Sequence, residues 1–171
     1  MQKKLVLILG GIKSGKSSFA LNLANQTVGK RAFIGTAEPF DEEMKKRIER
    51  HKLERGYTFE TFEEPIHLSS LLKKLLKIYD VILIDCLTVW LGNLFYYKID
   101  IKPALDDFIE VLKNFKRGYV FIVSNEVGLT IIPANEISRN YANYLGILNQ
   151  KIAEVSDEVY LVIAGIPLKI K

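Results

Sequence analysis

A glycine-rich segment near the amino terminus constrains the fold most strongly. An apolar run, residues 5–9, leads directly into Gly10-Gly11-Ile12-Lys13-Ser14-Gly15-Lys16-Ser17. This segment has the spacing G-x-x-x-x-G-K-[ST] of a phosphate-binding loop, or P-loop. Glycines let the backbone bend so that successive N–H groups point at an anion. Because an apolar strand pattern precedes the segment and a helical pattern, residues 18–24, follows it, nucleotide binding is favoured over a chance glycine-rich turn.

The polar residues of the loop have distinct expected roles. Lys16 can reach the outer phosphates of a nucleotide as a flexible point charge. Ser17 can offer its hydroxyl to a magnesium ion. The dipole of the following helix adds to the same anion site, since its amino-terminal end carries a partial positive charge. The sequence therefore predicts that residues 10–17 bind a nucleoside triphosphate together with Mg²⁺.

Strand and helix patterns alternate along the rest of the chain. Strands are predicted at residues 31–35, 57–62, 81–84, 119–123 and 158–163, with a short closing segment at 167–170. Helices are predicted at residues 41–55, 68–76, 87–97, 104–115 and 136–156. This order predicts an α/β fold with a mostly parallel sheet, helices on both faces, and a carboxy-terminal antiparallel edge strand. In such sheets ligands bind at the carboxyl ends of the strands.

Composition narrows the class of protein. A length of 171 residues suits one domain, so we expect residues 1–171 to form a single nucleotide-binding domain. The net charge of +4 comes without a long basic run, which does not favour nucleic acid as a partner. The single cysteine, Cys86, cannot form an internal disulfide, which fits a cytoplasmic protein. We expect no membrane span, because no segment is long and apolar enough.

Polar residues follow two of the predicted strands. Asp85 ends the apolar run 81–84, where an acid in a P-loop protein helps to hold magnesium, directly or through water. The alternative is a solvated acid that caps the next helix. Cys86 beside it is favoured as a small packing residue over a nucleophile. Residues 124–128, Ser-Asn-Glu-Val-Gly, could order a loop over the substrate or cap backbone groups, and they are not the N-K-x-D motif by which signalling GTPases read guanine.

One of the two histidines shares a helix face with apolar residues. Met44, Ile48 and His51 are spaced i, i+4 and i+7, so they lie on one side of the helix predicted at 41–55. The pattern alone favours a packing role for His51 over a catalytic one. His67 follows a proline at a helix start, where an ordinary structural role is expected.

The chain as a whole resembles the bifunctional adenosylcobinamide kinase / adenosylcobinamide-phosphate guanylyltransferase family of cobalamin synthesis, whose fold is P-loop NTPase-like (RecA-like). The likeness covers nearly the whole length. The matching residues are the P-loop, Asp41-Glu42-Glu43-Met44, Arg47-Ile48, His51-Lys52, Asp85-Cys86-Leu87-Thr88, Asn93-Leu94, Ser124-Asn125-Glu126-Val127-Gly128, Pro133, Arg139, Gly146, Asn149-Gln150, Gly165 and Lys169-Ile170-Lys171.

This resemblance implies roles for individual residues. His51 would be the residue that becomes guanylylated, acting with Lys16 and Asp85 in catalysis. Ser17 and Asp85 would hold Mg²⁺. Besides the P-loop, the implied nucleotide contacts are Thr36, Ala37, Glu38, Lys52, Glu63 and Asp85. GTP and ATP would be the nucleotides, adenosylcobinamide and its phosphate the corrinoid substrates, and a homotrimer the assembly.

Three positions depart from the family pattern. Lys13 stands where an arginine is common, Asp85 where some members have glutamate, and Asn143 where an aspartate is frequent. These departures put the predicted kinase activity in more question than the predicted guanylyltransferase activity, because His51 and its neighbours match the family pattern. Two rival interpretations stay open: a P-loop small-molecule kinase in which His51 only packs, and a non-enzymatic or motor-like P-loop module that couples hydrolysis to a partner or to nucleic acid.

Overall fold

The computed structural model describes residues 2–171, apart from four side chains on one helix, those of Arg47, His51, Glu54 and Arg55. The predicted alternation of strands and helices is confirmed. Within the described residues, seven strands form one sheet in the order β3-β2-β4-β5-β1-β6-β7. Every neighbouring pair is parallel except β6 and β7, so the antiparallel edge strand is confirmed too.

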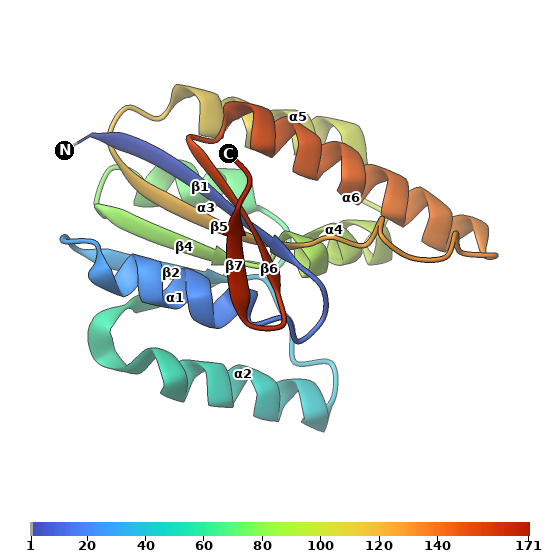
Figure 1. The fold of residues 1–171 in the computed structure, drawn as a ribbon, viewed down its shortest axis with the longest axis horizontal. Coiled ribbons are helices and arrows are strands. Elements are labelled where there is room, and N and C mark those ends of the chain that lie inside the picture. Colours follow the sequence, from blue (N-terminus) through green and yellow to red (C-terminus); the bar gives the residue numbers. More distant parts are fainter. Residues whose placement is uncertain (1) are drawn as a thin grey trace.

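The elements have the following bounds (Figure 1). The strands are β1 (Lys3–Gly10), β2 (Arg31–Gly35), β3 (Glu60–Glu63), β4 (Val81–Asp85), β5 (Gly118–Asn125), β6 (Glu158–Ile163) and β7 (Ile166–Lys169). The helices are α1 (Lys16–Gln26), α2 (Glu42–Arg55), α3 (Leu68–Leu75), α4 (Leu87–Tyr96), α5 (Ile101–Asn114) and α6 (Glu136–Val155), with a 3₁₀ turn, η1 (Gly56–Thr58). No helix of residues 2–171 combines the length and the apolar character needed to cross a bilayer.

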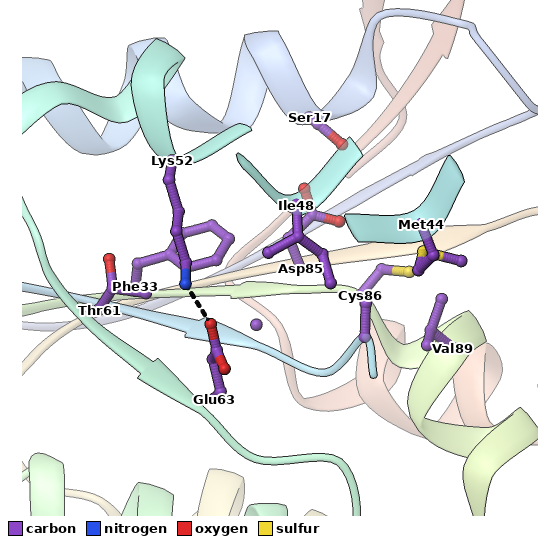
Figure 2. A pocket seen from close by; sticks show the side chains of 12 residues that line it. Ser17, Phe33, Met44, Ile48, Lys52, Thr61, Glu63, Asp85, Cys86 and Val89 are labelled. Carbon is purple, nitrogen blue, oxygen red and sulfur yellow. Dashed lines mark ion pairs between the residues drawn. The ribbon is translucent and has the colours of Figure 1, made fainter. Parts of the chain in front are cut away.

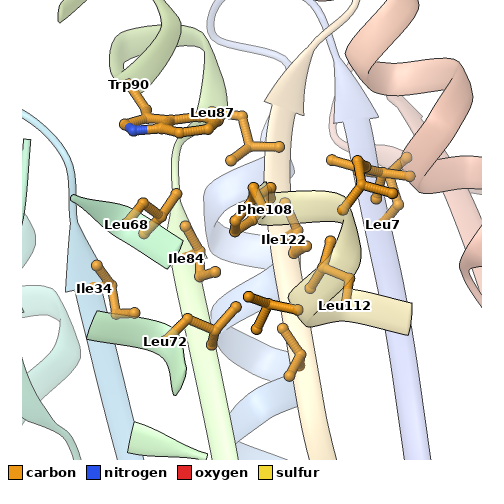
Figure 3. Close-up of a cluster of buried hydrophobic side chains, with 14 of the residues drawn as sticks. Leu7, Ile34, Leu68, Leu72, Ile84, Leu87, Trp90, Phe108, Leu112 and Ile122 are labelled. Atoms are coloured by element: carbon orange, nitrogen blue, oxygen red, sulfur yellow. The ribbon is translucent and has the colours of Figure 1, made fainter. Parts of the chain in front are cut away.

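Both faces of the sheet are covered by helices, as the sequence predicts. Side chains alternate along β1, so that Leu5 and Leu7 enter one apolar cluster while Val6 and Ile8 enter another. The larger cluster packs the sheet against α3, α4, α5 and α6, with Trp90 among its largest buried side chains (Figure 3). The smaller cluster packs against α1, and α2 lies on the same side of the sheet (Figure 1). Burial of these apolar faces is the main driving force for this arrangement.

The register brings the carboxyl ends of the central strands into one row. Gly10 at the end of β1 pairs with Asn125 of β5, and Asp85 at the end of β4 pairs with Val123 of β5. Gly35 of β2 lies beside Asp85 on one side and Glu63 of β3 on the other. The P-loop, the segment after β2 and the segment after β5 therefore all leave the sheet at the same edge.

Two predicted starts, 57 and 104, differ from the observed starts at 60 and 101 by three residues each. The strand predicted at 57–62 begins only at residue 60, because α2 ends at Arg55 and the chain then makes the turn η1, which starts at Gly56 with φ 61°. The helix predicted to begin at residue 104 begins at Ile101, since Pro103 falls in its first turn, where a missing N–H breaks no helical hydrogen bond. The predicted start of α2 is confirmed: the carboxylate of Asp41 accepts a hydrogen bond of 2.7 Å from the amide of Met44.

Candidate active site

The P-loop connects β1 to α1 and wraps the amino-terminal end of that helix. Gly15, the residue before α1, has φ 93°, a left-handed conformation that glycine adopts without a steric penalty. The buried ammonium group of Lys16 folds back over the loop and donates a hydrogen bond of 2.9 Å to the carbonyl oxygen of Gly11. Ile12 and Lys13 lie exposed at the tip of the loop. The loop therefore has the shape and charge of an anion-binding site at a helix terminus.

Close packing explains why the loop begins with glycine. A Cβ on Gly10 would lie 2.4 Å from the hydroxyl oxygen of Ser14 and 2.7 Å from the carbonyl oxygen of Val162 in β6. Ser14 is buried, and its hydroxyl has no hydrogen-bond partner among the described residues. By contrast, a Cβ on Gly11 would meet nothing within 4 Å. Packing therefore requires glycine at position 10 but not at position 11.

A pocket opens beside the P-loop at the carboxyl ends of β2, β3 and β4 (Figure 2). It contains about 650 Å³ of empty space, including its open mouth. The lining side chains come from six helices and strands and the segments next to them: Ser17, Phe33, Ala37, Met44, Ile48, Lys52, Thr61, Glu63, Asp85, Cys86 and Val89, with the backbone of Gly35. The pocket therefore gathers predicted site residues that lie far apart in the sequence.

Ser17 of α1 and Asp85 of β4 both line this pocket (Figure 2). A hydroxyl and a carboxylate are oxygen donors, the type of ligand that Mg²⁺ prefers, and Mg²⁺ commonly takes only one or two protein ligands with the rest from phosphates and water. Ser17 directly follows Lys16 in the P-loop, so the expected magnesium ligand is adjacent in sequence to the cation expected to bind phosphate. The chemistry of these two residues fits the predicted magnesium site.

Helix α2 supplies another wall of the pocket. Met44 and Ile48 line it, as the shared helix face predicts, and Lys52 forms an ion pair with Glu63 of β3 across its mouth (Figure 2). Both charged side chains are about half exposed. The backbone of His51 belongs to α2, but its side chain lies outside the described residues, so its predicted role as nucleophile stays a prediction.

Thr36 fastens the end of β2 to the end of β4. Its hydroxyl donates a hydrogen bond of 2.7 Å to the carbonyl oxygen of Cys86 and accepts one of 3.1 Å from the amide of Cys86. Asn93 of α4 donates to the carbonyl oxygen of Thr36 at 2.8 Å and to that of Pro65 at 3.0 Å. Because the hydroxyl of Thr36 is fully buried and engaged, its evident role is to fix the backbone next to Asp85.

The thiol of Cys86 is unsuited to act as a nucleophile. Burial, reinforced by the negative charge of Asp85, raises the pKa of the Cys86 thiol to about 11. The reactive thiolate is then scarce near neutral pH. This agrees with the packing role that the sequence favours for Cys86.

The remaining predicted contacts, Ala37 and Glu38, leave the sheet after β2. Ala37 lines the pocket, whereas Glu38 accepts a hydrogen bond of 2.7 Å from the hydroxyl of Tyr97 beyond the end of α4. This bond raises the pKa of Tyr97, because the neutral phenol donates to the carboxylate. The structure thus places Ala37 in the pocket and Glu38 against α4 at the same edge of the sheet.

Sequence reasoning missed several contributors to the site. Phe33 and Val89 line the pocket but have no sequence signal beyond an ordinary strand and helix. Glu64 accepts hydrogen bonds from the amides of Ile66 and His67 at 3.0 and 2.7 Å and so orders the turn directly before α3.

Comparison with known proteins identifies a matching protein family. Residues 6–170 match the family model described as "Cobinamide kinase / cobinamide phosphate guanyltransferase". The "Bifunctional adenosylcobalamin biosynthesis protein CobP" of Pseudomonas aeruginosa is 39% identical over 168 residues, which cover 96% of both chains. The "Bifunctional adenosylcobalamin biosynthesis protein CobU" of Salmonella typhimurium is 34% identical over 181 residues, which cover 98% of this chain and 99% of the relative.

Solved structures show the same fold at low identity. A KaiC-like protein from Pyrococcus horikoshii aligns with a TM-score of 0.54 and 14% identity, covering 92% of this chain and 70% of that one. The RadB recombinase aligns with a TM-score of 0.54 and 14% identity, covering 92% and 73%. These similarities show the RecA-like P-loop fold that the sequence predicts.

Proposed function

The chain belongs to the cobinamide kinase / cobinamide phosphate guanyltransferase family and is a kinase and nucleotidyltransferase of cobalamin biosynthesis; from this premise we propose how its residues divide the work. Nucleotide and corrinoid substrates fit this family. The single observation that carries the proposal is the pocket in which Ser17, Asp85 and the apolar face of α2 meet beside the P-loop. We further propose that residues 1–171 act as one nucleotide-binding domain.

In the kinase step, the P-loop amides and Lys16 bind the phosphates of ATP or GTP. The hydroxyl of adenosylcobinamide attacks the γ-phosphorus and a new P–O bond forms. The bond from the γ-phosphorus to the bridging oxygen breaks, the nucleoside diphosphate leaves, and the hydroxyl proton is released to water. Lys16 offsets the charge that develops on the leaving phosphates, because a preorganised cation near that charge stabilises the transition state. Mg²⁺ held by Ser17 and Asp85 would supply further charge neutralisation at the phosphates.

In the guanylyl step, a nitrogen of the unprotonated His51 imidazole attacks the α-phosphorus of GTP. A P–N bond forms, the bond from the α-phosphorus to the bridging oxygen breaks, and pyrophosphate leaves. The phosphate of adenosylcobinamide phosphate then attacks the same phosphorus, and the P–N bond breaks to free His51. Sequence spacing supports this role, because Met44 and Ile48, which share the i, i+4, i+7 pattern with His51, line the pocket.

Lys52 and Glu63 flank the mouth of the pocket and are proposed nucleotide contacts, together with Thr36, Ala37 and Glu38 after β2. The assembly implied by the family resemblance, a homotrimer, and a cytoplasmic location belong to the same proposal. The lone Cys86 and the biosynthetic role of the family support the cytoplasmic location.

Two labels test the two half-reactions separately. With adenosylcobinamide, label from the γ-phosphate of ATP or GTP should reach the corrinoid, and with its phosphate, label from the α-phosphate of GTP should do so. Lys16→Met should lower both transfers by at least about a hundredfold, since one preorganised charge is removed from the transition state. His51→Ala should abolish only the second. Transfer of the γ-label without any transfer of the α-label by the unmodified protein would contradict the guanylyl half.

A further inference from the structure

Strand β5 lies between the two strands that lead into the site. Its neighbours in the sheet are β4, which ends in Asp85, and β1, which leads into the P-loop. Asp85 pairs with Val123 of β5. Gly10, the first residue of the P-loop, pairs with Asn125, the last residue of β5. Since neighbouring strands lie roughly 4.8 Å apart, Asn125 is one strand away from Gly10 on one side and from the strand of Asp85 on the other.

The side chain of Asn125 belongs to the face of the sheet that packs against α1. Val123 enters the smaller apolar cluster together with Ala20 of α1. Ser124 points to the opposite face, where its buried hydroxyl donates a hydrogen bond of 2.7 Å to the side-chain oxygen of Asn149 in α6. Because successive side chains of a strand point to opposite faces, Asn125 lies on the same face as Val123.

The expected phosphate site lies on this face. Leu83 of β4 also enters the smaller cluster, so Asp85, two residues further along the strand, shares the face of α1. Helix α1, whose amino-terminal end the P-loop wraps, packs against the same cluster. Asn125 is not among the residues that line the pocket of Figure 2; it lies on the P-loop side of Asp85. Its side chain is therefore placed between Asp85 and the P-loop.

Hydrogen bonds hold the backbone around Asn125 in place. Its amide donates one of 2.8 Å to the hydroxyl of Thr88, and its carbonyl oxygen accepts one of 3.0 Å from the side-chain amide of Asn149. The next amide, that of Glu126, donates one of 3.0 Å to the carbonyl oxygen of Gly10. The half-buried side-chain amide of Asn125, by contrast, forms no hydrogen bond with another described group of residues 2–171. It can bind a ligand from a fixed backbone without giving up a protein partner.

We propose that the side-chain amide of Asn125 donates a hydrogen bond to an oxygen of the γ-phosphate of the bound nucleotide. This inference rests on the proposed function, which puts a triphosphate at the P-loop and Mg²⁺ at Ser17 and Asp85. In P-loop proteins the metal bridges the β- and γ-phosphates, so the outer end of the triphosphate is the end that faces Asp85. Asn125, which lies between Asp85 and the start of the P-loop, is beside that end.

A carboxamide has the chemistry that this position requires. Its NH₂ group donates to a phosphate oxygen, and because it carries no charge it does not repel Mg²⁺. During transfer of the γ-phosphoryl group, negative charge is spread over three outer oxygens, and fixed donors stabilise that charge. Lys16 and the loop amides approach the triphosphate from the P-loop, whereas Asn125 approaches it from β5. Asn125 is then a catalytic residue of the kinase step, because it touches the group that is transferred.

Two variants test this contact by nucleotide binding alone. Asn125→Leu removes the donor at similar volume, and Asn125→Asp keeps the shape but replaces the donor with a negative charge. Calorimetry with Mg²⁺ measures the Kd for GTP and for GDP, in a His51→Ala background so that no GMP is transferred to the protein. Asn125→Leu should weaken GTP binding by about tenfold and GDP binding by less than about twofold. Asn125→Asp should weaken GTP binding further, because its carboxylate repels the γ-phosphate.

The kinase reaction gives a second measurement. With His51 intact, Asn125→Leu should lower kcat for γ-phosphoryl transfer to adenosylcobinamide by about tenfold or more and change the KM for the corrinoid by less than about twofold. The matched control is Asn22→Leu, the same replacement at an exposed position of α1 beyond the P-loop. It should leave kcat and both dissociation constants unchanged.

A purely structural role for Asn125 predicts a different pattern. Unchanged GTP binding in both variants, or equal losses of GTP and GDP binding, would overturn the inference. It would also be overturned if Asn125→Asp, the better mimic in shape, bound GTP as well as Asn125→Leu or better. If the unmodified chain transfers no phosphate to adenosylcobinamide, the proposed function fails instead. The comparison of GTP with GDP needs no corrinoid, so it then still decides whether Asn125 contacts the γ-phosphate.

Discussion

The backbone carbonyl oxygen of Ser14 accepts a hydrogen bond of 2.8 Å from the amide of Gly165. This bond joins the P-loop at the start of the chain to the turn between β6 and β7 at its end. A Cβ at Gly15 would lie 3.2 Å from the Cα of Gly165, which itself has φ 79°. The turn therefore packs tightly against the P-loop. Glycine is favoured at Gly15 because a Cβ there would lie close to Gly165, and at Gly165 because of its positive φ.

Because the P-loop packs against β6, replacing its first glycine should cost more stability than replacing its second. Gly10→Ala should lower the free energy of unfolding by about 1–3 kcal/mol, because its Cβ would meet the carbonyl oxygen of Val162, a backbone atom that cannot move aside. Gly11→Ala should change it by less than about 0.5 kcal/mol, since its Cβ would meet open space. Urea unfolding of both variants checks this. Equal stabilities would show that β6 does not press against the loop.

The clamp between β2 and β4 depends on a hydroxyl group. Thr36→Val keeps the shape of the side chain but leaves the amide and carbonyl of Cys86 without their partner, so it should cost about 1–3 kcal/mol in the free energy of unfolding. Thr36→Ser keeps the hydroxyl and loses one methyl group, so it should cost about 1 kcal/mol. Denaturant unfolding measures both. A valine variant at least as stable as the serine variant would contradict the clamp.

The ion pair at the mouth of the pocket should matter for binding and not for stability. Lys52→Met should change the free energy of unfolding by less than about 0.5 kcal/mol, because both partners are about half exposed. It should raise the KM for GTP several-fold, since a cation beside the pocket is lost. The matched control is Lys73→Met, which breaks the similarly exposed pair of Lys73 with Asp107 outside the pocket. Equal KM values for the two variants would remove Lys52 from the nucleotide site.

A pH-dependent contribution to stability comes from β6. Glu158 contacts Lys4 at 2.8 Å and Lys169 at 3.0 Å, and these cations lower the pKa of Glu158 from 4.5 to about 2. Because the folded-state pKa is lowered, the stabilisation is full above the unfolded value and disappears as the pH falls towards 2. The free energy of unfolding of Glu158→Gln should therefore fall below that of the unmodified chain at neutral pH, with the gap closing in acid. A gap that is constant with pH would contradict this.

Local sequence signals predicted the helices and strands but not which side chains of different elements contact one another. The apolar strand, the glycine loop and the helix after it could be predicted because each depends on residues close together in the chain. The same holds for the cap of α2 by Asp41. The strand predicted at 57–62 was wrong in part because alternating side chains do not reveal where Gly56 turns the chain after a helix.

The site could be predicted only as a set of candidates. That Ser17, Asp85, Lys52 and Glu63 share one pocket follows from the strand order, which no local pattern specifies. Bonds over long sequence separations, such as the one from Asn93 to the carbonyl oxygen of Thr36, were equally out of reach. Asn93 belongs to the residues that carry the family resemblance, but only the fold gives it a physical role.

We propose above all that His51 carries GMP between GTP and the corrinoid phosphate. The most direct measurement is the intact mass of the protein after incubation with GTP and Mg²⁺. We expect one GMP-sized adduct per chain that disappears when adenosylcobinamide phosphate is added, and no adduct on His51→Ala. An adduct of the same size and yield on His51→Ala, or none on the unmodified chain while guanylyl transfer proceeds, would contradict the account.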